Sequence, residues 1–195
     1  MALFENFSDT LRFVATATRH PLKIGAVWPS SHELVTAMAA HVNPLEPGPV
    51  IELGSGTGAI TEGLLNRGIE QSRLILVESH PPFYEDLREH FPKAQCYFAN
   101  AYNIRSLAEK EAFPKAAAII SGLPLRTQSA ETKRAFVASV LCLLQPGAPF
   151  IQFSYGFSPP VDEREVGASL VATETIWKNI PPARIWVYQA SPHSG

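Results

Sequence analysis

The sequence predicts an α/β fold in which a largely parallel sheet is covered by helices on both faces. Short apolar runs alternate with segments of helical periodicity between residues 50 and 155. The run 50–58, Val-Ile-Glu-Leu-Gly-Ser-Gly-Thr-Gly, is typical of a strand followed by a glycine-rich turn. At 195 residues, 46% of them hydrophobic, the chain can form one domain with a substantial core.

The individual elements follow from this alternation. Strands are expected at roughly 50–53, 74–78, 95–98, 117–121 and 149–155, and helices near 59–67, 82–91, 104–112 and 130–144. Beyond residue 155 the pattern changes to two strands, near 169–177 and 184–190, joined by a proline-containing link. Such a pair predicts an antiparallel closure at one edge of a Rossmann-like sheet of about seven strands.

The segment 1–49 precedes the first sheet strand and is predicted to be a helical extension of the domain at 50–195. Leu3, Phe7, Leu11 and Val14 recur at steps of three and four, which predicts an amphipathic helix. A basic flank at 19–23 follows it, so the helix could lie in a membrane interface. The pattern alone favours the alternative, a helix packed on the domain's own core.

Ser30 and Glu33 have the spacing of a capping box at the start of a second helix in this extension. A helix N-terminus also presents N–H groups that can bind a carboxylate. Ser30 and Ser31 are therefore candidate ligand-binding residues as well as capping residues.

Composition excludes several classes of protein. The net charge of −2 gives no basic field for nucleic acid, and no apolar stretch approaches the length of a membrane span. Cys96 and Cys142 lie in apolar sequence and are expected as buried thiols rather than a disulfide. No Cys/His cluster has metal-ligand spacing, so no metal is expected. The start of the chain lacks the pattern of a signal peptide, which predicts a cytoplasmic location.

The glycine loop predicts a nucleotide-containing ligand, and two ligands compete for it. Gly54, Gly56 and Ala59 also satisfy the dinucleotide fingerprint, and Glu78 lies 22 residues after Gly56 at the end of an apolar run. In both interpretations Glu78 accepts hydrogen bonds from ribose hydroxyls. Glu52 discriminates between them, because a carboxylate beside the loop suits a cationic ligand better than a pyrophosphate. The sequence therefore favours S-adenosylmethionine, with S-adenosylhomocysteine as product, over NAD(P).

The remaining candidate site residues follow the ends of the predicted strands, because ligands of such sheets bind at the carboxyl ends. The candidates for cofactor binding, besides those named above, are Ser55, Thr57, Ser79, Asn100, Ala101 and Ser121. The candidates for catalysis are Tyr102, Ser121, Gly122, Leu123 and Tyr155. If the methyl acceptor is an amine, it must be neutral, and backbone carbonyls at 121–124 and a tyrosine hydroxyl could orient it and pass its proton to water.

Several further stretches resemble the bacterial phospholipid N-methyltransferases, which methylate phosphatidylethanolamine toward phosphatidylcholine. The stretches are Gly-Ala-Val-Trp-Pro-Ser-Ser at 25–31, 50–61, 77–78, Ile-Ser-Gly-Leu-Pro-Leu at 120–125, 149–156 and Trp-Lys-Asn-Ile-Pro-Pro-Ala at 177–183. The resemblance implies a class I methyltransferase fold, S-adenosylmethionine as donor and a lipid substrate. It also implies a peripheral position on the inner face of the cytoplasmic membrane, where the N-terminal helix would contact an anionic surface.

Two departures and two alternatives accompany this resemblance. The family usually has Pro where Ser55 lies and Asp where Asn100 lies. An rRNA or other nucleic-acid adenine methyltransferase is the alternative enzyme, but that group usually has an Asn-x-x-Phe/Tyr pattern at 121–124 and a basic extra domain. A non-catalytic S-adenosylmethionine-binding or membrane-interaction module is the third hypothesis. The sequence does not indicate an oligomeric state.

Overall fold

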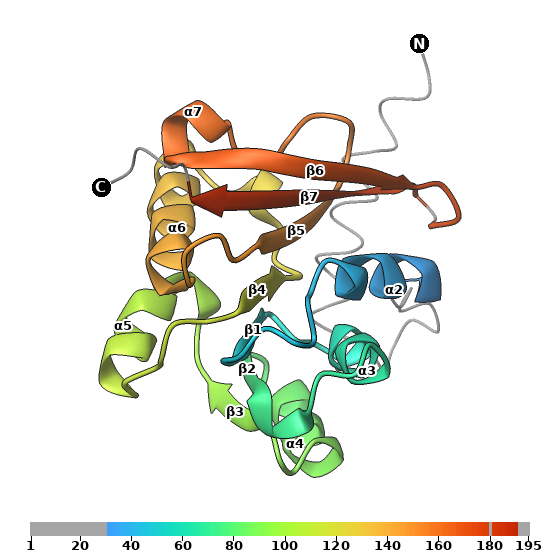
Figure 1. Cartoon of the computed structure of the whole chain (residues 1–195), viewed down its shortest axis with the longest axis vertical. Helices are drawn as coiled ribbons and strands as arrows, with labels where there is room; N and C mark the ends of the chain where they lie inside the picture. Colours follow the sequence, from blue (N-terminus) through green and yellow to red (C-terminus); the bar gives the residue numbers. More distant parts are fainter. Residues whose placement is uncertain (1–30, 180, 191–195) are drawn as a thin grey trace.

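The computed structural model describes residues 31–179 and 181–190. They form a seven-stranded sheet in the order β3-β2-β1-β4-β5-β7-β6 (Figure 1). The strands are β1 (Val50–Leu53), β2 (Leu74–Glu78), β3 (Gln95–Phe98), β4 (Ala118–Ser121), β5 (Phe150–Tyr155), β6 (Ala168–Ile176) and β7 (Ala183–Ala190). The first five run parallel, and β7 pairs antiparallel with both β5 and β6. The predicted fold class and its antiparallel edge are confirmed.

Helices cover both faces of this sheet (Figure 1). The α-helices are α2 (His32–Ala40), α3 (Ala59–Asn66), α4 (Pro81–His90), α5 (Ile104–Lys110), α6 (Ala130–Leu143) and α7 (Glu163–Val166). Three short 3-10 helices lie at η1 (Gln71–Arg73), η2 (Ala101–Asn103) and η3 (Leu125–Thr127). One buried cluster joins α2, α3 and α4 to the sheet, and a second joins α5, α6 and α7 to its other face.

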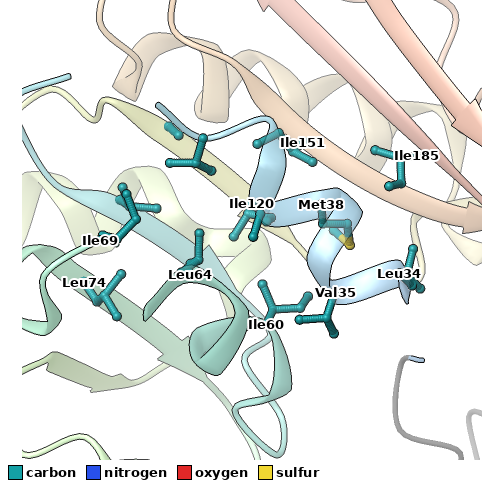
Figure 2. Close-up of a cluster of buried hydrophobic side chains, with 14 of the residues drawn as sticks. Leu34, Val35, Met38, Ile60, Leu64, Ile69, Leu74, Ile120, Ile151 and Ile185 are labelled. Carbon is teal, nitrogen blue, oxygen red and sulfur yellow. The ribbon is translucent and has the colours of Figure 1, made fainter. Parts of the chain in front are cut away.

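Helix α2 belongs to the core of the domain, although it precedes β1 in the chain. Leu34, Val35 and Met38 pack against α3 and against buried residues of the strands (Figure 2). The Ser31 hydroxyl caps the helix by accepting a hydrogen bond from the backbone N–H of Leu34. The capping pattern therefore begins one residue later than the predicted Ser30, which lies outside the described residues, as does the predicted helix near residues 3–18.

Most predicted boundaries agree with the structure to within one residue, but one expectation was wrong and one short helix was missed. Cys142 is exposed, because α6 turns Phe136, Val137 and Val140 inward and places Cys142 on its outer side. Helix α7 was not predicted, since its four residues are too few to show a helical period. Among the described helices, none is long and apolar enough to cross a membrane.

Candidate functional site

The site begins at the turn from β1 into α3, where three glycines adopt left-handed backbone conformations. Gly54, Gly56 and Gly58 have φ angles of 74°, 53° and 82°. A Cβ at Gly54 would lie 2.8 Å from the Leu123 side chain, and one at Gly58 would lie 2.6 Å from Phe91. A Cβ at Gly56 would meet nothing within 4 Å. Gly54 and Gly58 are thus required by packing, whereas Gly56 keeps the open side of the loop clear.

Backbone hydrogen bonds connect this turn to the neighbouring strands. The N–H of Gly54 donates to the carbonyl of Val77 on β2, and that of Gly122 donates to the carbonyl of Leu53. A Cβ at Gly122 would lie 3.1 Å from the carbonyl oxygen of Gly54. The loops after β1 and β4 are therefore in close contact at the carboxyl edge of the sheet.

Glu78, at the end of β2, holds three backbone N–H groups. One carboxylate oxygen accepts from Gly56 at 2.8 Å, and the other accepts from Ser79 and His80 at 2.7 Å each. The residue is buried, with 8% of its surface exposed. A carboxylate has about four acceptor positions, so three N–H groups leave room for one further donor. Glu78 fixes the glycine loop, and its contact with ribose stays a prediction.

Glu52 lies at the centre of the sheet with no exposed surface. One carboxylate oxygen accepts a 2.6 Å hydrogen bond from the Thr61 hydroxyl of α3. Its other oxygen and the buried Ser55 hydroxyl form no hydrogen bond of ordinary geometry within the described residues, although the Ser55 hydroxyl lies close enough to stabilise the ionised carboxylate. Burial raises the pKa of Glu52 to about 8, the bond from Thr61 opposes the rise, the nearby Glu78 carboxylate adds to it, and the Ser55 hydroxyl opposes it. A carboxyl group so placed is largely protonated at neutral pH.

The other predicted cofactor-binding residues lie along the same edge. Thr57 and Ser79 are exposed, in the glycine loop and directly after β2 respectively. Asn100 follows β3, and its side-chain oxygen accepts from the N–H of Tyr102, which is a capping role. Ala101 is buried. The structure thus brings the predicted residues of four strand ends to one edge, while an adenine contact by Asn100 stays a prediction.

Two buried side chains organise the loop after β4: Ser121, which the sequence indicated, and Gln152, which it did not. Ser121 is fully buried, and its hydroxyl accepts from the N–H of Leu123. Gln152 of β5 donates its side-chain N–H to the Leu123 carbonyl at 3.0 Å, and the N–H of Leu125 donates to the same oxygen. The Leu123 carbonyl is therefore engaged within the protein, although the sequence placed it among the groups that could orient an amine.

The two candidate catalytic tyrosines lie on different sides of the sheet. Tyr102 packs against Phe136 of α6, with ring centroids 5.3 Å apart, and a hydrogen bond with the Gln128 side chain opposes the rise in the pKa of its hydroxyl. Tyr155 packs with the other cluster, against Phe153. Burial raises the pKa of both hydroxyls, so both stay protonated at neutral pH. They do not form a pair.

Asn179 joins three segments that are far apart in the sequence. Its side chain is buried, accepts from the N–H of Ser31 at 3.1 Å and donates to the carbonyl of Pro181 at 2.7 Å. A hydrogen bond with Tyr155 opposes the rise in the pKa of that hydroxyl. Asn179 thus ties the β6–β7 turn to Tyr155 and to the start of α2. The sequence showed only its motif, since its partners depend on tertiary contacts.

The arrangement fits a ligand that has a ribose and a cationic group. The open side of Gly56 permits close approach to the loop, and the buried Glu52 carboxyl lies on the strand that leads into it, with the Ser55 hydroxyl acting on that carboxyl. A cation near Glu52 would be stabilised by the ionised carboxylate. These features distinguish the loop from a turn that serves only to connect β1 with α3.

The chain was compared with protein families, with curated proteins and with solved structures. No protein-family profile matches the chain. An ornithine lipid N-methyltransferase of Singulisphaera acidiphila is 28% identical over 149 residues, which cover 75% of this chain and 78% of that protein.

Among solved structures, a Burkholderia thailandensis 1,6-didemethyltoxoflavin-N1-methyltransferase with bound S-adenosylhomocysteine has a TM-score of 0.67 at 15% identity. The match covers 98% of this chain and 92% of that one. The CcbJ methyltransferase of Streptomyces caelestis has a TM-score of 0.64 at 15% identity, covering 85% of this chain and 100% of its own. The chain therefore has the Rossmann-like fold of class I S-adenosylmethionine-dependent methyltransferases.

Proposed function

We propose that this protein transfers a methyl group from S-adenosylmethionine to the amine of a membrane-lipid head group, with phosphatidylethanolamine as substrate. The observation that supports this donor is the glycine loop: a Cβ at Gly56 would meet nothing within 4 Å, and the strand that leads into the loop carries the buried Glu52 carboxyl. The similarity to a lipid N-methyltransferase over three quarters of the chain supports a lipid amine as acceptor. The phospholipid itself is favoured by the sequence resemblance described above.

The donor would lie along the loop after β1. Glu78 holds the N–H groups of Gly56, Ser79 and His80, and it has acceptor capacity for a ribose hydroxyl. The carboxyl of Glu52 would face the cationic end of the donor, directly or through water. When bound, the donor supplies an electrophilic methyl group on a sulfonium.

Acceptance of the methyl group requires a neutral, correctly oriented amine, so positioning contributes much of the rate. The Tyr155 hydroxyl stays protonated and is held by Asn179, so it can accept a hydrogen bond from an amine N–H without itself becoming charged. The Gly122 backbone lies against the glycine loop and is the second candidate for orienting the amine. The Leu123 carbonyl is less suited, because Gln152 and Leu125 already donate to it.

The test is incubation of the full chain with methyl-labelled S-adenosylmethionine and four separate acceptors. These are vesicles containing phosphatidylethanolamine, vesicles containing ornithine lipid, ribosomal RNA, and vesicles of phosphatidylglycerol alone. We expect label in phosphatidylethanolamine. Label in ornithine lipid alone would correct the substrate, label in RNA would support the adenine methyltransferase alternative, and no label in any acceptor would refute transfer to these amines.

Membrane association belongs to the same proposal. A lipid substrate with its acyl chains cannot leave the bilayer at low cost, since each CH₂ moved into water costs about 0.8 kcal/mol. The enzyme must therefore bind the surface, and the amphipathic pattern of residues 3–14, with its basic flank, is the first candidate contact. Deleting residues 1–20 should then leave a folded domain with reduced binding to anionic vesicles.

A further inference from the structure

An exposed aromatic pair lies at the carboxyl edge of the sheet. Phe157 follows β5 and Trp177 follows β6, and their ring centroids are 6.3 Å apart. The two side chains are 68% and 69% exposed. Isolated exposed apolar residues are common on protein surfaces, whereas two large aromatic rings in contact with each other and open to solvent mark an interaction surface.

Three cations lie next to this pair or contact the residues beside it in the chain. The Arg184 guanidinium lies 6.0 Å from the centre of the Phe157 ring and donates to the Phe157 carbonyl. Arg126 donates to the carbonyl and the hydroxyl of Ser158, and Lys178 is exposed in the β6–β7 turn. Within residues 31–179 and 181–190, none of the three cations forms an ion pair with a carboxylate.

Acidic residues do not neutralise this surface from the neighbouring strand. Glu174 of β6 pairs with Ile185, which is buried in the cluster on the α2 side. Successive side chains of a strand point to opposite faces, so the adjacent Thr175, which accepts from Arg184, lies on the other face from Glu174. On the α2 side, Glu33 is exposed two residues after Ser31, whose N–H donates to Asn179. The opposite side of β6 and β7, which carries Thr175 and Arg184, is thus locally cationic on a chain whose net charge is −2.

We propose that Phe157, Trp177, Arg126, Arg184 and Lys178 form a lipid-docking patch for an anionic bilayer surface, an inference that rests on the proposed function. Tryptophan and phenylalanine rings partition into the head-group region, and basic side chains beside them attract anionic lipids. The patch adjoins Tyr155 and Asn179 (Figure 1 shows the β6–β7 turn beside α2). Docking there brings lipid head groups to the edge of the sheet that carries the glycine loop.

The test is binding of the full chain to vesicles of phosphatidylcholine containing phosphatidylglycerol, measured by sedimentation without any methyl donor. The double substitution Phe157→Ala with Trp177→Ala should lower the partition coefficient at least tenfold at both low and high salt. Lys178→Gln should lower it about fivefold at low salt, the factor that about 1 kcal/mol per cation gives. That effect should vanish at high salt.

Matched controls lie at the opposite edge of the sheet. Leu45 is 89% exposed before β1, and Arg67 is exposed at the end of α3. Leu45→Ala and Arg67→Gln should leave vesicle binding unchanged. If the aromatic double variant binds vesicles as well as Leu45→Ala does, the proposed docking patch is refuted. Because the aromatic side chains are exposed, their replacement should leave the unfolding midpoint in urea near that of the unchanged chain.

A second measurement identifies what covers the aromatic pair. Lipids brominated in their acyl chains should quench tryptophan emission of the unchanged chain more than that of Trp177→Phe. Equal quenching, together with faster proteolysis of residues 1–30 in the double variant, would show that the chain's own N-terminal segment occupies the patch and would overturn the proposal.

Methylation rates on monomeric and bilayer lipid distinguish a failure of the docking patch from a failure of the proposed function. The double variant should methylate a short-chain phosphatidylethanolamine dispersed as monomers at the rate of the unchanged chain, and should be slow only on bilayers. Slow transfer to the monomeric lipid as well would contradict a docking role. If the unchanged chain methylates neither form of the lipid, the proposed function is refuted. The vesicle-binding measurements then still test whether the patch binds a bilayer.

Discussion

Replacing Glu52 by Gln should make the stability of this protein less dependent on pH. The pKa of Glu52 is raised from 4.5 to about 8 by burial, so the folded state keeps a proton that the unfolded state loses. As pH rises from 4.5 to 8, the free energy of unfolding therefore falls, and above pH 8 the loss levels off. At about 1.36 kcal/mol per pH unit, the full effect is about 5 kcal/mol.

About half of this loss, ~2.5 kcal/mol, falls between pH 5.5 and 7.5. Glu52→Gln is neutral at every pH and has nearly the shape of the protonated side chain. Its oxygen can still accept from Thr61, and its amide N–H group can donate toward the Ser55 hydroxyl, which acts on the carboxyl in the unchanged chain. The variant should thus be more stable than the unchanged chain at pH 7.5, and the difference should shrink at pH 5.5.

Urea unfolding at the two pH values measures this difference. Glu62→Gln is the matched control, because Glu62 is exposed on α3, the helix that carries Thr61. The control should follow the unchanged chain at both pH values. A stability difference between Glu52→Gln and the unchanged chain that is the same at pH 5.5 and 7.5 would refute the argument that Glu52 folds in its protonated form.

The same proton provides a signature of donor binding. If a cationic ligand comes near Glu52, the ionised carboxylate is favoured and a proton leaves on binding. Calorimetry of S-adenosylmethionine binding at pH 7 in two buffers of different ionisation enthalpy should show this release in the unchanged chain. Glu52→Gln should bind more weakly and release no proton. Equal proton release in both chains would show that the group that titrates is not Glu52.

Three further substitutions test the site and the core. Gly56→Val should keep the fold and lose S-adenosylhomocysteine binding in calorimetry. The control is Gly147→Val, which should bind normally, because Gly147 has a similarly positive φ and open surroundings but lies away from the loop. Binding by both variants would refute the loop assignment. Glu78→Gln should weaken donor binding at least tenfold. In the variant, the glutamine NH₂ group must face at least one of the backbone N–H groups that donate to the Glu78 carboxylate in the unchanged chain. Unchanged affinity would contradict this role of Glu78. Gly63→Ala should cost about 1–3 kcal/mol in urea unfolding, because its Cβ would lie 2.3 Å from Val35. Adding Val35→Ala should recover part of that loss, and strictly additive losses would argue against the contact.

The sequence predicted the strands well because burial on both faces produces continuous apolar runs. Leu74–Glu78 and Phe150–Tyr155 are examples whose ends are marked by polar or glycine residues. The helix cap was displaced by one residue: the capping-box spacing to Glu33 favoured Ser30, whereas the helix begins at His32 and the Ser31 hydroxyl accepts from the Leu34 N–H. Helix boundaries commonly shift by this amount.

Site residues could be predicted from the sequence only where their role follows from their position at a strand or at the end of one. Glu52 and Glu78 could be found because each occupies a fixed position relative to the glycine loop. Gln152 and Asn179 could not, because each acts through a partner 29 or more residues distant in the chain. Polar residues of this kind show no sequence pattern that distinguishes them from ordinary surface positions.

The hydrogen bond from the Ser31 backbone to Asn179 has a consequence for avidity. It fixes the point where residues 1–30 join the fold next to the turn that carries Trp177. A chain of that length reaches at most about 100 Å when extended, so any surface contact made by residues 1–30 lies within reach of the membrane that the turn would touch. Two weak contacts joined in this way act at an effective concentration on the order of millimolar. If both proposed contacts form, each can be weak and quickly reversed, while the two together would keep the protein on the bilayer long enough to meet successive lipid molecules.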